Sequence, residues 1–89
     1  MIEARIAVIN RLGLHARAAA KLVQLLAEFS SNITLKREHR EVNAKSIMGV
    51  MMLAAGNGST LLATVDGVDE VACMNAMQAL FAARFHEGQ

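Results

Sequence analysis

The sequence predicts an α+β protein, a two-layer open-faced sandwich in which helices cover one face of a four-stranded antiparallel sheet. Two observations carry this prediction. Short segments with alternating apolar residues are interleaved with longer segments of helical spacing. Their order along the chain is strand, helix, strand, strand, helix, strand, helix. Alternation along the strands indicates a sheet with only one covered face.

The predicted strands span residues 2–9, 33–37, 40–43 and 61–65. In the first strand, the inward positions are Ile2, Ala4, Ile6 and Val8. The second and third strands are expected to form a hairpin that turns near Glu38 and His39. In the fourth strand Leu61, Ala63 and Val65 occupy alternate positions.

The predicted helices span residues 16–29, 47–53 and 70–84. The first has an apolar stripe at helical spacing, formed by Ala19, Leu22, Val23, Leu26 and Phe29. Ser46 stands where an N-cap of the second helix is expected, and Asp69 where a cap of the third is expected. The third helix carries Met74, Met77, Phe81 and Phe85 along one side.

Length and composition predict one domain over residues 1–89, with an aliphatic core. Hydrophobic residues make up 54% of the chain, and its three aromatic residues are all Phe. The lone Cys73 excludes an internal disulfide. The longest apolar run, residues 47–55, is too short to cross a bilayer, and no signal-type segment opens the chain. We therefore expect a cytoplasmic protein without membrane insertion.

Charge is uneven along the chain. Residues 1–45 hold eight basic and four acidic side chains, a net charge of +4, whereas residues 46–89 have a net charge of −3. A basic first half suits an anionic ligand or an acidic partner, although a chance distribution over a solvated surface gives the same balance. The absence of Tyr, Trp and any basic run argues against a nucleic-acid partner.

The strongest candidate site is His15, where a loop ending in Gly13 becomes the first helix. A helix N-terminus has free backbone N–H groups that bind phosphate, and a neutral imidazole is a good nucleophile. Arg17 adds a cation that can hydrogen-bond to phosphate oxygens. These residues predict a phosphate-accepting site. The alternative is that His15 merely caps the helix and Arg17 is solvated.

The other two histidines are weaker candidates. His39 falls in the predicted hairpin turn and His86 near the end of the chain, and we expect both to be exposed polar residues. The histidines lack the spacing of metal ligands, and Cys73 has no sequence neighbour that would complete a site. We therefore expect no metal.

The second candidate region is the helix after Ser46, which has two apolar stripes. One consists of Ile47, Val50, Leu53 and Ala54, and the other of Met48, Met51, Met52 and Ala55. A short helix on a sheet buries only one stripe, so the other is expected to remain exposed and to bind proteins. The alternative is that a loop or the last helix covers both. Ser46 is either only a cap or also a phosphate acceptor beside the methionines.

Two segments resemble a known family. Residues 10–19, Asn-Arg-Leu-Gly-Leu-His-Ala-Arg-Ala-Ala, resemble the active-site signature of HPr, the phosphocarrier of the bacterial phosphoenolpyruvate-dependent phosphotransferase system. Residues 45–53, Lys-Ser-Ile-Met-Gly-Val-Met-Met-Leu, resemble the regulatory serine region of the same family. The spacing of the motifs, the chain length and the order of elements also agree, over about residues 1–85.

The resemblance implies a sheet of strand order 1-4-2-3 and a function. His15 would accept a phosphoryl group on Nδ1 from phosphorylated Enzyme I, with help from Arg17, and pass it to a IIA protein or domain. Ser46 would be the target of HPr kinase/phosphorylase in organisms that have this enzyme. We expect partner contacts at Ala20, Ile47, Met48, Met51 and Met52. A monomeric carrier without a cofactor and without independent turnover is expected.

One departure from the family pattern is visible, because many members have proline where this chain has Ala18. Alanine keeps a good helix propensity, so we expect a slightly less rigid helix start and intact chemistry. Two other interpretations stay open. One is the nitrogen-branch paralogue, which uses the same histidine with a different Enzyme I. The other is a binding module regulated at Ser46 that transfers no phosphoryl group.

Overall fold

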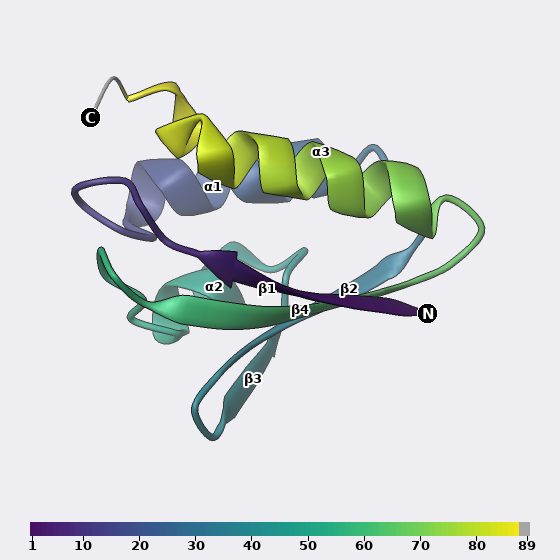
Figure 1. Cartoon of the computed structure of the whole chain (residues 1–89), viewed down its shortest axis with the longest axis horizontal. Helices are drawn as coiled ribbons and strands as arrows, with labels where there is room; N and C mark the ends of the chain where they lie inside the picture. Colours follow the sequence, from purple (N-terminus) through teal and green to yellow (C-terminus); the bar gives the residue numbers. More distant parts are fainter. Residues whose placement is uncertain (88–89) are drawn as a thin grey trace.

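The computed structural model describes residues 1–87 and confirms the predicted α+β sandwich (Figure 1). The strands are β1 (Ile2–Ala7), β2 (Asn32–Arg37), β3 (Arg40–Asn43) and β4 (Thr60–Asp66). The helices are α1 (Ala16–Leu26), α2 (Ile47–Met52) and α3 (Glu70–Ala82), followed by the 3₁₀ turn η1 (Arg84–His86). No helix in this described part of the chain is long and apolar enough to cross a membrane.

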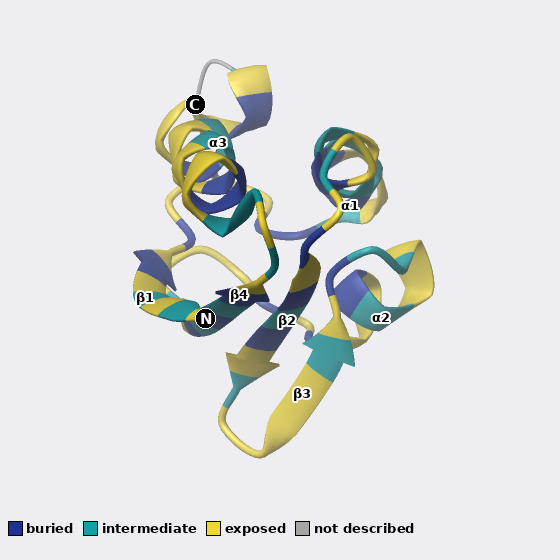
Figure 2. Cartoon of the chain, turned by 90° about the vertical axis from the view of Figure 1, so that its right-hand side faces the viewer, coloured by how far each residue is buried: buried dark blue, intermediate teal, exposed yellow. Residues whose placement is uncertain are grey.

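The sheet has the expected order β1-β4-β2-β3, with every neighbouring pair antiparallel. The register places Val65 of β4 between Ile2 of β1 and Ile33 of β2. Side chains that alternate along the strands point to one covered face, where Ile33, Leu35, Leu61, Ala63 and Val65 are buried. Helices α1 and α3 lie side by side over this face, and α2 lies next to β3 (Figure 2).

The core is aliphatic except for two phenylalanines near the end of the chain. Phe81 of α3 and Phe85 of η1 are buried and pack edge to face, with ring centroids 4.9 Å apart. After α3 the chain runs through a left-handed stretch, in which Arg84, Phe85 and His86 have φ values of 55°, 55° and 61°. This stretch ends α3 at Ala82, two residues before the predicted end, while Phe85 remains in the core.

The first helix also ends earlier than predicted. Helix α1 stops at Leu26, and the chain then tightens, because the N–H of Phe29 donates to the carbonyl of Leu26 three residues back. Phe29 still packs against the core, which explains why the apolar spacing continues past the helix. Strand β1 likewise ends at Ala7, although Val8 is fully buried.

The sequence predicted that Asp69 caps α3, but its side chain makes no capping hydrogen bond. Its carboxylate instead accepts hydrogen bonds from the backbone N–H groups of Ser30 and Ser31, at 2.8 and 3.0 Å, and from the Ser31 hydroxyl. The carboxylate therefore joins the turn before α3 to the turn after α1. These hydrogen bonds, led by that of the Ser31 hydroxyl, lower the pKa of Asp69 to about 2.

Candidate functional site at the start of α1

The loop before His15 is fixed by its backbone. Leu14 donates its N–H to the carbonyl of Ala55 at 2.9 Å, and its side chain is buried. Gly13 has a left-handed φ of 65°, and a Cβ there would lie 2.4 Å from the Ala55 oxygen. Only glycine allows this close approach of the two loops. His15 therefore follows a rigid connection between the start of α1 and the segment after α2.

His15 is the N-cap residue of α1, with an extended backbone (φ −73°, ψ 176°). Its carbonyl accepts the first helical hydrogen bond from Ala19 at 2.8 Å. Its imidazole makes no capping hydrogen bond, so the ring does not serve the helix. This finding removes the interpretation of His15 as a side-chain cap. The side chain of His15 remains 28% exposed beside the first-turn N–H groups.

The imidazole instead contacts the C-terminal segment. His15 Nε2 lies 2.5 Å from Oε2 of Glu87, and the other carboxylate oxygen accepts from Asn10 Nδ2 at 3.2 Å. Burial alone would raise the pKa of Glu87. The hydrogen bonds from His15 and Asn10, together with the nearby positive charge of Lys21, outweigh it and hold this pKa below its ordinary value. Glu87 is therefore ionised at neutral pH.

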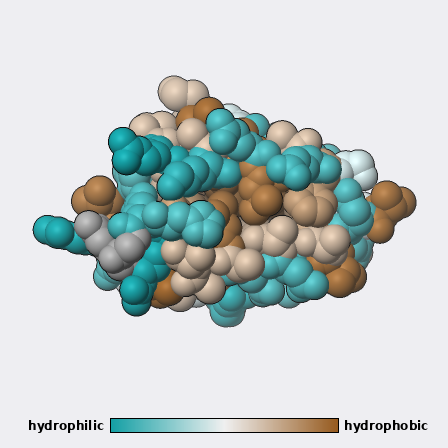
Figure 3. All heavy atoms as spheres, turned by 90° about the horizontal axis from the view of Figure 1, so that it is seen from above, coloured by the Kyte–Doolittle hydropathy of each residue, from teal (hydrophilic) through white to brown (hydrophobic). Residues whose placement is uncertain are grey.

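A hollow of about 310 Å³ opens at this place. It is lined by Leu12, His15, Arg17, Lys21, His86 and Glu87. Arg17 is exposed, and Lys21 donates to the carbonyl of Phe85 at 2.6 Å. The start of α1 and the C-terminal segment both lie at the left of Figure 1. Seen from above, this end of the helix-covered face is mostly hydrophilic, and apolar side chains lie nearer the middle (Figure 3). The hollow is small and holds two cations, Arg17 and Lys21, against the one carboxylate of Glu87, and the two cations suit a phosphoryl group.

Several residues of this site were not predicted as such. Lys21 of α1 is not part of the predicted apolar stripe and was not a predicted site residue, and His86 was expected to be an exposed polar residue. His86 is exposed, but it also lines the hollow. Glu87 lies 72 positions from His15 in the chain, too far for local spacing to connect them. The sequence holds one hint of this contact. Phe85 lies on the predicted apolar side of the last helix, so the chain was expected to reach the core two residues before Glu87.

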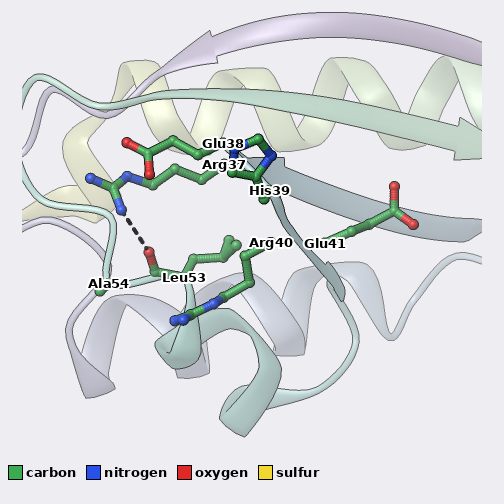
Figure 4. Close-up of a pocket in the computed structure, with 7 residues that line it drawn as sticks. All are labelled: Arg37, Glu38, His39, Arg40, Glu41, Leu53 and Ala54. Carbon is green, nitrogen blue, oxygen red and sulfur yellow. Dashed lines mark hydrogen bonds between the residues drawn. The ribbon is translucent and has the colours of Figure 1, made fainter.

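A larger hollow of about 740 Å³ lies at the β2–β3 hairpin and shares no residue with the first (Figure 4). His39, which lines it, is exposed as expected. The guanidinium of Arg37 donates to the carbonyl of Leu53 at 3.3 Å, and that of Arg40 to the carbonyl of Met52. These arginines satisfy the free carbonyls at the C-terminus of α2, so their charges have a structural partner.

Ser46 caps α2 as predicted, because its Oγ accepts from the N–H of Gly49 at 3.1 Å. The exposed apolar residues of α2, which we call the methionine patch, are Ile47, Met48, Met51 and Met52, with exposed fractions of 42%, 70%, 40% and 57%. Val50 and Leu53 are buried, as expected for the inward stripe.

Three residues around α2 differ from the predicted stripes. Ile47 was placed on the inward stripe but is exposed, because it stands at the free start of the helix. Ala54 was placed on the inward stripe and Ala55 on the outer one, but Ala54 is exposed and Ala55 is buried. The helical spacing fails there because α2 ends at Met52 and Ala54 adopts a left-handed φ of 50°.

The other predicted residues lie on α1 and α3. Ala20 lies on α1 and is half-buried, and Ala18 in the first turn is fully buried. Cys73 is a buried free thiol of α3, as expected. In residues 1–87 no three His, Cys, Asp or Glu side chains are grouped so that they could hold a metal ion.

Fold and site together define a small open-faced sandwich that presents a histidine at a helix N-terminus, next to an arginine and a lysine. The family model described as "PTS HPr component phosphorylation site" matches residues 2–83. The phosphocarrier proteins HPr of Xylella fastidiosa and Cupriavidus necator are both 55% identical to this chain, over 98% of both chains for the first and all of both chains for the second. The chain belongs to the HPr family of phosphocarriers of the phosphotransferase system.

A solved structure agrees with this assignment. The chain superposes on the crystal structure of an HPr from Thermoanaerobacter tengcongensis with a TM-score of 0.94 and 40% identity, and the match covers 98% of each chain. Among sequence relatives there is also a phosphocarrier protein NPr from Shewanella violacea, which is 40% identical over 97% of this chain and 94% of its own.

Proposed function

We propose that this protein accepts a phosphoryl group on Nδ1 of His15 from phosphorylated Enzyme I and passes it to IIA proteins. The observation that carries the proposal is that His15, Arg17 and Lys21 line one small hollow at the start of α1. A nucleophilic ring, free backbone N–H groups and two cations are the groups that phosphoryl transfer needs. Arg17 and Lys21 neutralise the phosphoryl oxygens, and the partner protein completes the catalytic surroundings.

The methionine patch and Ala20 are the surface that we propose for Enzyme I and IIA proteins. Exposed apolar side chains on one short helix are typical of a contact surface, and methionine adapts to more than one partner. The hydrogen bond between Leu14 and Ala55 connects the end of α2 to the loop before His15, so a partner bound there lies close to the ring. A carrier that moves between partners is expected to work as a monomer in the cytoplasm.

Ser46 is the second candidate phosphorylation site, for HPr kinase/phosphorylase. Its support is its position, because its hydroxyl caps α2 immediately before the methionine patch. A phosphate there adds negative charge next to an apolar docking surface and weakens the binding of a partner.

Within the family, the nitrogen-branch carrier is the alternative. The HPr relatives are 43–55% identical to this chain and the NPr protein is 40% identical, which favours the general HPr function. The discriminating measurement is which of the two Enzymes I phosphorylates this protein faster.

The test is transfer of label from labelled phosphoenolpyruvate in the presence of Enzyme I. We expect acid-labile, base-stable label on the wild type and on His39→Ala, and none on His15→Ala. If folded wild-type protein takes no label from an active Enzyme I of either branch, the carrier function is wrong. A binding module regulated at Ser46 would then be the best remaining interpretation.

A further inference from the structure

The C-terminal segment returns to the active histidine, and we propose that Glu87 is a positioning residue for phosphoryl transfer. Glu87 keeps the proton of the neutral His15 ring on Nε2, and so leaves Nδ1 as the nucleophile. This inference deepens the proposed function and rests on it. It is carried by the contact of 2.5 Å between His15 Nε2 and Glu87 Oε2 and by what holds Glu87 in place.

The chain before Glu87 is anchored on two sides. Phe85 is fully buried and packs against the ring of Phe81. Lys21 of α1 donates to the carbonyl of Phe85 at 2.6 Å. The helix that His15 caps therefore also holds the C-terminal segment that contacts the His15 ring. Three consecutive left-handed residues, 84–86, then direct the chain toward the start of α1. Such a backbone persists only where surrounding contacts determine it.

The carboxylate of Glu87 is itself held. Asn10 is fully buried, and its Nδ2 donates both to the carbonyl of Gly13 at 2.7 Å and to Glu87 Oε1 at 3.2 Å. One amide group therefore connects the loop that positions His15 with the carboxylate that contacts its ring. Glu87 is 12% exposed, unlike the partners of an ordinary surface ion pair.

The chemistry follows from which atoms can donate. A carboxylate only accepts hydrogen bonds, so the neutral ring must donate from Nε2, and Nδ1 then keeps its lone pair. In the transfer, Nδ1 forms the bond to phosphorus, and the bond from phosphorus to the donor breaks with its electron pair left on the donor. No proton leaves the ring. The positive charge that the phosphorylated ring acquires lies opposite the carboxylate of Glu87.

Two variants separate hydrogen bonding from charge. Glu87→Ala removes the acceptor, whereas Glu87→Gln keeps an acceptor oxygen without the charge. Glu28→Ala is the matched control, because Glu28 is an exposed glutamate just past α1. Two measurements are made on each protein: the ¹H and ¹⁵N NMR signals of the His15 ring in the free protein, and kcat/KM for phosphorylation by Enzyme I. Thermal unfolding checks that the fold is kept.

We expect the wild type and Glu28→Ala to show one ring tautomer, with a protected Nε2–H signal. Glu87→Ala should lose that signal, show mixed tautomers and be phosphorylated about tenfold more slowly, as expected for the loss of a hydrogen bond to a charged group. Glu87→Gln should keep the tautomer and lie between the two in rate.

A Glu87→Ala variant with the ring signals or the phosphorylation rate of the wild type would overturn the proposal. So would a slower Glu87→Ala variant whose ring signals are unchanged, because Glu87 would then act in another way. The ring signals need no phosphoryl donor. If Enzyme I labels none of the proteins, while Glu87→Ala still changes the tautomer, the proposed function fails and the effect of Glu87 on the ring stands.

Discussion

The imidazole of His15 takes no part in capping α1, because the backbone alone starts the helix. The carbonyl of His15 accepts from Ala19, while the ring turns away from the helix to Glu87. In many helices the N-cap side chain satisfies one of the first N–H groups. Here those N–H groups stay available beside the ring, next to the exposed Arg17, and they can serve an anion instead.

We expect Arg17 to bind the phosphoryl group through the planar shape of its guanidinium as well as through its charge. Arg17→Ala should lower kcat/KM for phosphorylation by about tenfold or more, because it removes charge-assisted hydrogen bonds to the phosphoryl oxygens. Arg17→Lys should recover only part of the loss, since an ammonium cannot form a bidentate pair. Label transfer from Enzyme I measures both. Arg5→Ala, on the outer face of β1, is the control, and an Arg17→Ala rate within twofold of that control would contradict the prediction.

Asp69 should make the stability of the protein depend on acid pH. Its pKa of about 2 in the folded protein lies below the ordinary value of 3.8, so its stabilising effect is complete above about pH 4. That effect is lost as the pH falls toward 2 and the carboxylate is protonated. In thermal unfolding, wild-type Tm should therefore fall more steeply between pH 4 and 2 than that of Asp69→Asn. Parallel curves for the two proteins would show that Asp69 contributes nothing.

At the scale of elements, the loop that contains Gly13 has no room for a side chain at that position. Gly13→Ala should destabilise the protein by about 1–3 kcal/mol, because the left-handed φ disfavours a side chain and the Cβ would press on Ala55. Urea unfolding measures this. The same variant should be phosphorylated more slowly even at a temperature where it is fully folded, because His15 follows the displaced loop. Gly58→Ala is the control: its φ is also positive, at 93°, but no atom lies within 4 Å of the added Cβ.

Periodicity predicted these elements because each buries one face. Alternation located β1, β2 and β4, and helical spacing located α1 and α3, since burial against one common core imposes both patterns. Strand β3 could be placed only as the hairpin partner of β2. The ends were missed where apolar residues stay buried beyond the helix, as at Phe29 and Phe85. His15 and Arg17 could be recognised because they are two positions apart. Glu87 and Asn10 could not, because only the folded chain brings them to the ring.

Viewed as a whole, the molecule places the proposed phosphoryl site and the candidate docking surface at adjoining loops. The loop of Gly13 and Leu14 contacts Ala55, just past the end of α2. The C-terminal segment closes the other side of His15 through Glu87. If the methionine patch is the docking surface, as proposed, a partner bound there would lie next to the loop that carries His15.

This arrangement predicts a defect in docking without a defect in folding. Met48 is 70% exposed, so Met48→Glu should leave the free energy of unfolding within about 0.5 kcal/mol of the wild type. An apolar partner surface would have to desolvate the new carboxylate, and KM for Enzyme I should rise about tenfold with kcat little changed. Val68→Glu is the matched control, since Val68 is 98% exposed in the turn between β4 and α3, outside the methionine patch. Equal KM values for the two variants would mean that partners do not dock on the methionine patch.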